Sequence, residues 1–453
     1  MYRRSWTAFR AAVATVVIAA SLAACTDQVT VAPPSDPATP RLIRELAAAR
    51  RVVAFEKPAP VRPALVHLGQ ALAFDKILSG NHDVSCTSCH LPKFSTSDGR
   101  SLSIGAGGSG LGPERTHPDG TLIPRNSPPM FNLGALRHMF WDGRVQVDQD
   151  GTFHSPAGAQ LTPAMTSVFE FGALSAQPMF PVTSRAEMRG QSGNELTDIP
   201  DDSVDLIWAA LMKRLGAIPE YRTMFEAAYP GVKFDDMNFA YASNAIAGFI
   251  VDQMTFTNTP WDRFLAGDDH ALSPEQLDGA EAFLVAKCST CHNGSTFSDD
   301  EFHDVAVPQL GPGEGNGASS TDDFGRMNVT GNPADKYRFR TTPLRNVELT
   351  PPYGHDGAFT TLRAFIEHYS ESDKKLLDFD PKELDASLQT TLMTSNTSDI
   401  LANRDTLLAG VVLTPDLVDK LVAYMGALTD DAARDLSHVI PASVPSGLPV
   451  DRP

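Results

Sequence analysis

The chain has 453 residues, with 37 lysines and arginines against 55 aspartates and glutamates, so its formal net charge is −18. This acidic balance argues against nucleic acid or anionic lipid as a partner, and it favours a small basic protein that docks on one face. The length is sufficient for two or three domains, each with its own hydrophobic core.

Residues 1–24 have the features of a lipoprotein signal peptide. Arginines precede an apolar stretch at residues 11–20 that is too short to span a bilayer, and the segment closes on Leu-Ala-Ala-Cys25, which resembles a bacterial lipobox. Cys25 is therefore predicted to be lipidated, and the protein to be a periplasmic lipoprotein that meets the membrane only through this anchor. Thr26, in place of Asp, favours the outer membrane over the inner one. A plain secretory leader with an incidental cysteine is the alternative.

The pattern of apolar residues and turn residues predicts a mostly helical chain. Residues 25–40 are a tether rich in proline and alanine, and residues 436–453 form an irregular tail. Helices are expected at residues 41–51, 65–79, 208–229, 238–265 and 414–428, and another is expected to begin with a capping signature at Ser273.

Two Cys-x-x-Cys-His motifs carry the chemistry. They are formed by Cys86, Cys89 and His90, and by Cys288, Cys291 and His292. This spacing allows two thiols to bond to the vinyl groups of one haem while the adjacent imidazole binds its iron. The sequence therefore predicts two covalently bound haem c groups and redox chemistry. The haems and the lipid use all 5 cysteines, so none is left for a disulfide.

Both halves of the chain follow the same order of helix, haem motif, long loop and closing helix. This order predicts two cytochrome c-like domains, mostly α, with one haem each. The N-terminal domain would span residues 41–270 and the C-terminal domain residues 271–435.

Other segments resemble the bacterial di-haem cytochrome c peroxidase and MauG superfamily. They are Arg-Asn-Ser-Pro at residues 125–128, Phe-Trp-Asp-Gly-Arg at residues 140–144, and the run from Leu-Arg-Asn to Gly-His-Asp-Gly at residues 344–357. The resemblance implies a peroxidatic haem at the first motif and an electron-transfer haem at the second. It also implies that Trp141 relays electrons between the two haems.

The same resemblance implies a calcium ion between the two domains. Asn126, Thr350 and Pro352 match the family positions whose oxygens hold this ion. Carbonyl and amide oxygens are ligands that suit a hard cation.

The acid–base group is assigned by spacing. Gln177, Pro181 and Glu187 reproduce the spacing of the family's distal pocket, although an insertion between Arg144 and Leu174 lengthens the preceding loop. In that pocket a carboxylate moves a proton from the near oxygen of peroxide to the far one. Gln177 would hold the peroxide, and Pro181 would keep other ligands off the iron. Taken alone, a glutamate such as Glu187 is more often a solvated loop carboxylate, and it is the Gln and Pro in register that favour the distal pocket.

The loop after the first haem motif departs from the pattern of peroxidases that need reductive activation. Those members carry a capping histidine there, whereas this chain has Ala106 in the matching stretch. His117 lies further along the longer loop and is a candidate cap. The other interpretation is a surface histidine in a turn.

The second haem also departs from the typical peroxidase. Tyr369 stands fourteen residues after His355, where typical peroxidases have a methionine ligand and MauG-like members have a tyrosine. A phenolate favours ferric and higher oxidation states, whereas a thioether raises the potential. Met327, Met393 and His368 are rival ligands. His355 is expected close to this haem without binding its iron.

These features predict a periplasmic di-haem peroxidase that reduces hydrogen peroxide to water with electrons from a small cytochrome c or a cupredoxin. One alternative is a MauG-like enzyme that uses peroxide to oxidise aromatic residues of a partner protein. A second alternative is a non-catalytic electron-transfer cytochrome. The resemblance leaves a homodimer open as the state of assembly.

Overall fold

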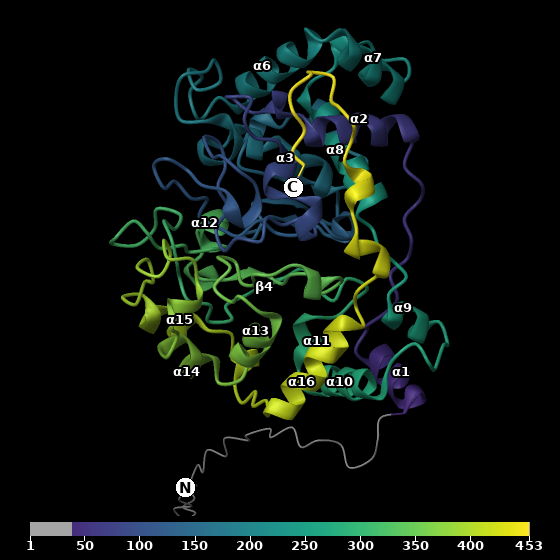
Figure 1. Ribbon diagram of the computed structural model, residues 1–453, viewed down its shortest axis with the longest axis vertical. Coiled ribbons are helices and arrows are strands. Elements are labelled where there is room, and N and C mark those ends of the chain that lie inside the picture. The colour runs from purple at the N-terminus through teal and green to yellow at the C-terminus, as the bar shows by residue number, and fades with distance from the viewer. Residues whose placement is uncertain (1–38, 453) are drawn as a thin grey trace, which may run out of the picture.

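The computed structural model describes residues 39–452, so the leader, Cys25 and nearly all of the tether lie outside the described residues. Two mostly helical halves are stacked along the long axis of the molecule, as Figure 1 shows. None of the helices in the described part has the length and apolarity needed to span a bilayer.

The upper half in Figure 1 holds the first haem motif. Its helices are α2 (Pro63–Phe74), α3 (Cys86–Cys89), α4 (Pro163–Thr166), α5 (Ala173–Ala176), α6 (Val204–Gly216), α7 (Pro219–Ala228) and α8 (Phe239–Gln253). A small antiparallel sheet joins β1 (His138–Met139), β2 (Val145–Val147) and β3 (Phe153–His154), with Met139 opposite Val145 and Val147 opposite Phe153.

The lower half holds the second haem motif. Its helices are α1 (Pro40–Ala49), α9 (Pro260–Leu265), α10 (Pro274–Val285), α11 (Cys288–Cys291), α12 (Met327–Thr330), α13 (Leu362–His368), α14 (Ser372–Leu377), α15 (Thr397–Asn403) and α16 (Pro415–Gly426). Two short strands, β4 (Phe302–His303) and β5 (Phe339–Arg340), pair antiparallel.

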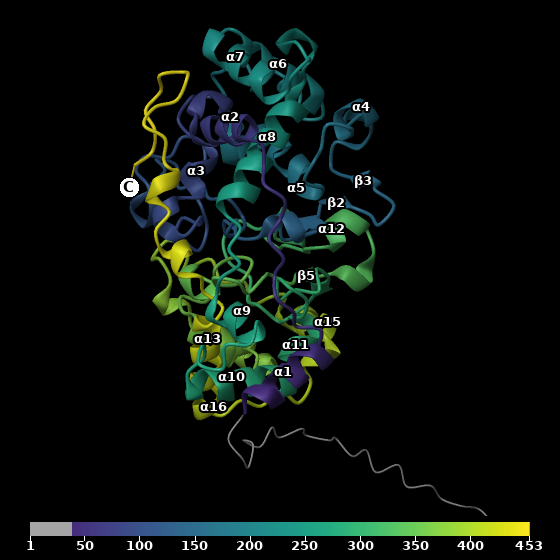
Figure 2. The same ribbon diagram turned by 90° about the vertical axis from the view of Figure 1, so that its right-hand side faces the viewer.

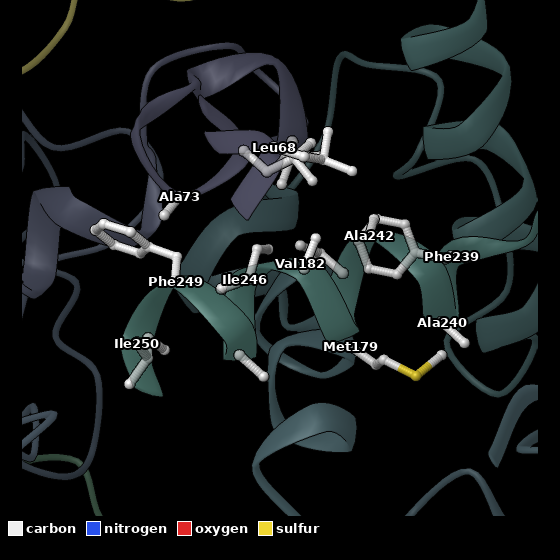
Figure 3. Packing of buried hydrophobic residues seen from close by; sticks show 14 of the residues in the cluster. Leu68, Ala73, Met179, Val182, Phe239, Ala240, Ala242, Ile246, Phe249 and Ile250 are labelled. Carbon is white, nitrogen blue, oxygen red and sulfur yellow. The ribbon is translucent and has the colours of Figure 1, made fainter. Parts of the chain in front are cut away.

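The helix that precedes the first haem motif packs against α8 through a glycine. A Cβ on Gly69 of α2 would lie 1.9 Å from the carbonyl oxygen of Ala245, so only glycine allows this approach. Close by, the rings of Phe74 and Phe249 meet edge to face at 6.2 Å. Figure 3 shows the apolar side chains that fill this interface, among them Leu68. This packing fixes the direction in which the chain enters α3.

The second half contains an equivalent glycine contact between two helices. A Cβ on Gly279 of α10 would lie 2.0 Å from the carbonyl oxygen of Lys420 in α16. The predicted capping signature is confirmed, because Ser273 and Gln276 form a reciprocal capping box at the start of α10. In both halves, therefore, a glycine-bearing helix leads into the haem motif and packs against a later helix.

Two of the predicted helices are interrupted. The chain expected to be helical over residues 208–229 breaks before Pro219, and the chain expected to be helical over residues 238–265 breaks before Pro260. Each proline occupies the first turn of the next helix, where it needs no backbone N–H donor. The preceding residue is extended in both cases, as the proline ring requires.

The N-terminal helix of the described chain packs in the second half, and the C-terminal segment packs in the first half. The two halves therefore differ from the predicted domains. Ile43 and Ala47 of α1 are buried in the core of the second half, together with Trp261 of α9. Residues 433–444 contribute instead to the core of the first half. The yellow C-terminal segment runs along the first half in Figures 1 and 2.

Polar contacts hold this C-terminal segment in place. Gln70 donates a hydrogen bond to the carbonyl oxygen of Val439 at 2.8 Å, and Ser446 donates to Asp75 at 2.6 Å. Asp451 accepts a hydrogen bond from Ser88, which lies between the two cysteines of the first haem motif. The segment predicted as an irregular tail is therefore a bound part of the first half.

Candidate active site

The first Cys-x-x-Cys-His motif lines a large cavity in the first half. Cys86, Cys89 and His90 all face it. The Nδ1 atom of His90 donates a hydrogen bond to the carbonyl oxygen of Thr96 at 2.9 Å, so Nε2 is the nitrogen left to bind a metal. Two thiols and an imidazole oriented in this way fit a covalently attached haem with a proximal histidine.

The three residues predicted for the distal pocket line the same cavity. Gln177, Pro181 and Glu187 come from three consecutive short turns, the last of which is the π-helical turn Arg185–Arg189. The hydroxyl of Ser184 caps this turn by accepting a hydrogen bond from the backbone N–H of Glu187 at 3.3 Å. The structure thus brings the predicted set together, with the insertion accommodated elsewhere.

Glu187 lies in a protein environment that disfavours its charged form. Burial raises the pKa of Glu187 above its ordinary value, and the positive charge of Arg144 opposes the shift. The loop after the first haem motif supports this side of the cavity, because the backbone N–H of Ala106 donates to the Glu187 carbonyl at 2.9 Å. A Cβ on Gly105 would lie 2.0 Å from the carbonyl oxygen of Ala186, so the contact requires glycine.

His117 does not belong to the wall of the first cavity. Its Nδ1 accepts a hydrogen bond from the backbone N–H of Asp119 at 3.1 Å, and its Nε2 lies against Gly107. The imidazole ring therefore stabilises a turn within its own loop. This placement agrees with a histidine in a turn and not with the candidate cap.

The second motif lines a separate cavity in the second half. Cys288, Cys291 and His292 face it, and Nδ1 of His292 donates to the carbonyl oxygen of Phe297 at 3.0 Å. The donor set again fits a haem with a proximal histidine. Tyr369, directly after α13, lines the same cavity.

Tyr369 is the one candidate distal ligand of the four that reaches the second cavity. Met327 and Met393 do not line it, and His368 uses Nε2 to donate to the carbonyl oxygen of Val305 at 2.8 Å. Burial, together with the sulfur of Cys291, raises the pKa of Tyr369. A bound ferric ion would supply the opposing charge that favours the phenolate.

His355 also lines the second cavity, as predicted for a residue near that haem. Its ring stacks on Phe339 with centroids 3.7 Å apart, and Nε2 lies 3.2 Å from Nε2 of Gln309. Burial lowers the pKa of His355 to about 3, so the imidazole is neutral.

Trp141 lies between the two cavities and lines both. Its indole Nε1 donates to the carbonyl oxygen of Asn126 at 2.8 Å, and the Asn126 N–H donates to the carbonyl oxygen of His355 at 2.8 Å. These bonds fix the indole at the junction of the two halves.

The predicted calcium ligands border one cavity. Asn126, Thr350 and Pro352 all line the second cavity. The Asn126 side chain donates through Nδ2 to the carbonyl oxygen of Arg100 at 2.8 Å, which fixes the orientation of its amide. An amide oxygen and backbone carbonyls from both halves fit a hard cation, and the ion itself stays a prediction.

A buried ionic network beside Trp141 was not assigned from the sequence. Arg125 binds Asp323 through two bonds of 2.7 and 2.9 Å and Asp142 through one of 2.6 Å. These contacts join the two halves, since Asp323 comes from the second. Arg125 and Asp142 stand inside the segments that resemble the family, whereas Asp323 lies in a glycine-rich loop without any motif.

The fold and the two donor sets define a mostly helical redox protein with two haem sites. A family model for di-haem cytochrome c peroxidase matches residues 63–270. The methylamine utilization protein MauG of Methylorubrum extorquens is 30% identical over 340 residues, which cover 74% of this chain and 77% of that protein. The cytochrome c551 peroxidase of Pseudomonas aeruginosa is 27% identical, covering 85% of this chain and 84% of that protein.

Solved structures share the fold. The crystal structure of a MauG-like protein associated with microbial copper homeostasis has a TM-score of 0.58 at 23% identity and covers 85% of this chain and 97% of that one. The chain belongs to the di-haem cytochrome c peroxidase family. It is an oxidoreductase of the cytochrome c peroxidase type with two haem cofactors, so the alternative of a non-catalytic cytochrome is set aside.

Proposed function

We propose that the protein is a periplasmic, lipid-anchored di-haem peroxidase with two cytochrome c-like domains, and that it reduces hydrogen peroxide with electrons from a small cytochrome c or a cupredoxin. The observation that carries this proposal is the shared cavity. Gln177, Pro181 and Glu187 line the same space as Cys86 and His90. Peroxide bound there would meet an acid–base group and a hydrogen-bonding amide.

A haem held by the first motif would supply the iron that binds peroxide. Glu187 accepts the proton from the near oxygen and delivers it to the far oxygen, so that the far oxygen leaves as water. Its raised pKa brings the carboxyl closer to the working pH, which eases transfer in both directions. The Gln177 amide orients the peroxide by hydrogen bonding, and the ring of Pro181 keeps bulk water away.

Trp141 provides the path between the two haem sites, because its indole lines both cavities. The overall reaction is H2O2 plus two electrons and two protons giving two waters, so two single electrons must cross between the sites. Steady-state oxidation of a reduced small cytochrome c by peroxide tests this activity. Trp141→Phe should slow it at least tenfold. Unchanged turnover in that variant would remove the indole from the path.

MauG-like oxidation of a partner protein is the second candidate. Tyr369 supports it, because this residue lines the second cavity whereas Met327 and Met393 do not. A phenolate ligand stabilises the high oxidation states that oxidation of a protein side chain requires. Peroxide-driven modification of a co-encoded partner protein, compared with turnover of a reduced cytochrome, separates the two activities.

We also propose one calcium ion at Asn126, Thr350 and Pro352. Dialysis against a calcium chelator should remove about one equivalent per chain, measured by metal analysis, and slow electron transfer between the haems. Calcium should restore the rate and magnesium should not, since magnesium demands a smaller, regular octahedral site. Full activity after complete removal of calcium would rule out a role for the ion in turnover.

The anchor is tested at Cys25. Wild-type protein should fractionate with membranes and incorporate labelled fatty acid, and Cys25→Ser should do neither. Export of both forms should place the haem domains in the periplasm, where haem attachment gives a c-type spectrum. Membrane association of the Cys25→Ser protein would contradict the lipid anchor.

A further inference from the structure

The two haem cavities differ greatly in size. The cavity at the first motif has a volume of about 1140 Å³ and the cavity at the second motif about 200 Å³. The first cavity also extends past the motif and distal-pocket residues that would contact a haem, to a wall built from other segments. Peroxide, with two heavy atoms, does not need this space.

The additional space lies beneath an outer wall, which we call the antechamber. It is lined by Gln146, Phe153, Pro156, Arg326, Asn328 and Val329. The first three residues belong to the insertion after Arg144, which forms strands β2 and β3. The others belong to α12 and the residue before it, which come from the second half. Figure 2 shows β2 and β3 beside α12.

Hydrogen bonds hold the two parts of this wall together. The Nη2 atom of Arg326 donates to Oε1 of Gln146 at 2.7 Å, and Nη1 donates to the carbonyl oxygen of Gly143 at 2.9 Å. Phe153 is fixed by an edge-to-face contact with Phe169 at 5.3 Å. The contacts of Arg326 therefore fix the two sides of the antechamber relative to each other.

The chemistry of the wall selects its ligand. Phe153, Pro156 and Val329 offer apolar and aromatic surface, which takes a flat ring. Arg326 adds a positive charge, because its hydrogen bonds go to backbone carbonyl oxygens and an amide oxygen. The carboxylates of Asp142, Asp335 and Glu301 act on this charge only from a longer distance. A planar aromatic molecule with a carboxylate satisfies both features.

We propose that the antechamber binds a small phenolic carboxylate, which serves as a second electron source at the first haem site. This inference rests on the proposed peroxidase function. Each phenol gives up one electron and its hydroxyl proton and becomes a phenoxyl radical. Two phenols therefore reduce one hydrogen peroxide to two waters, with no further oxidant or reductant. These electrons enter at the first site and do not cross Trp141.

Binding is measured first, by titration calorimetry of the holoenzyme with vanillate, and with its methyl ester as the uncharged comparison. Vanillate should bind one molecule per chain, at least tenfold more tightly than the ester. Arg326→Gln should abolish this preference, and Arg326→Lys should retain most of it. Equal binding of acid and ester to the wild type would overturn the assignment of the carboxylate to Arg326.

Blocking the pocket gives the second test. Val329→Trp should lower vanillate-dependent peroxide turnover at least tenfold relative to the cytochrome-dependent turnover of the same variant. Leu206→Trp is the matched control, since Leu206 is an exposed apolar residue of α6 with 53% of its surface accessible, and it should leave the ratio within twofold of wild type. An unchanged ratio in Val329→Trp overturns the proposal.

The outcomes also separate this inference from the function on which it rests. If the wild type consumes peroxide with a reduced cytochrome but neither binds nor oxidises vanillate, only the antechamber proposal fails. If it consumes peroxide with neither donor while binding vanillate normally, the peroxidase function fails. If only a protein partner is oxidised, the antechamber proposal is again overturned.

Discussion

Replacing Glu187 with glutamine isolates proton transfer from the rest of the distal pocket. The substitution preserves side-chain size, and the backbone of residue 187 keeps two contacts that position it. Its N–H donates to Ser184 at 3.3 Å and its carbonyl accepts from Ala106 at 2.9 Å. The amide therefore occupies the same place but can no longer take the proton from peroxide.

The expected decrease in rate follows from the contribution of an acid–base residue to proton transfer. A positioned acid–base residue accelerates proton transfer by about 10²–10⁴-fold. At about 1.36 kcal/mol for each factor of ten, this corresponds to roughly 2.7–5.4 kcal/mol of transition-state stabilisation. We expect Glu187→Gln to react with peroxide at least a hundredfold more slowly, with unchanged thermal stability.

The assay is stopped-flow absorbance of the fully ferric protein mixed with stoichiometric peroxide. Because burial raises the pKa of Glu187 above the ordinary 4.5, the wild-type rate should fall as the pH drops through that raised pKa, where the carboxylate becomes protonated. The glutamine variant should lack this acid limb. Glu314→Gln, which removes another carboxylate from the same cavity, is the matched control and should retain the limb. A Glu187→Gln rate within threefold of wild type, or the same acid limb, would refute the assignment.

Three further changes test other parts of the structure. Gly105→Ala places a Cβ 2.0 Å from the carbonyl oxygen of Ala186. It should lower the free energy of unfolding by about 1–3 kcal/mol, measured by chemical denaturation, and it should slow the reaction with peroxide. Wild-type stability and rate would contradict the close approach. Asp262→Asn breaks a buried pair with Arg345, bonded at 2.7 and 2.8 Å, and should cost about 3–5 kcal/mol in the same measurement. Although burial opposes ionisation, Arg345 lowers the pKa of Asp262, so the stability from this pair should be present at neutral pH and be lost as the pH falls through the lowered pKa. Tyr369→Phe should raise the reduction potential of the second haem by more than about 59 mV in a redox titration, which is a tenfold change in a one-electron equilibrium. An unchanged potential would show that the phenol does not bind the iron.

The sequence predicted the parts of the site that depend on short spacing. The haem motifs, and the Gln177, Pro181 and Glu187 set, are fixed by residues close together along the chain, and the structure places each set on one cavity wall. Trp141 was likewise placed between the haem sites on the strength of its local motif. Such signals do not depend on how distant segments pack.

The long-range contacts had no comparable signal. The apolar residues Ile43 and Ala47 indicate a buried helix face but not which core covers it. Arg125 and Asp323 are separated by 198 residues, so nothing local marks them as a pair. The breaks before Pro219 and Pro260 were missed because apolar residues continue on both sides of each proline.

The attachment of the C-terminal segment has a consequence for the order in which the protein is assembled. Asp451 binds Ser88 inside the first haem motif, and these residues are 363 positions apart. In the export proposed above, the N-terminal part of the chain crosses the membrane first, so Cys86 and Cys89 arrive before Asp451 and before residues 433–444, which complete the first core. The chain order therefore leaves an interval in which an assembly enzyme can reach both cysteines before the last residues bind beside them.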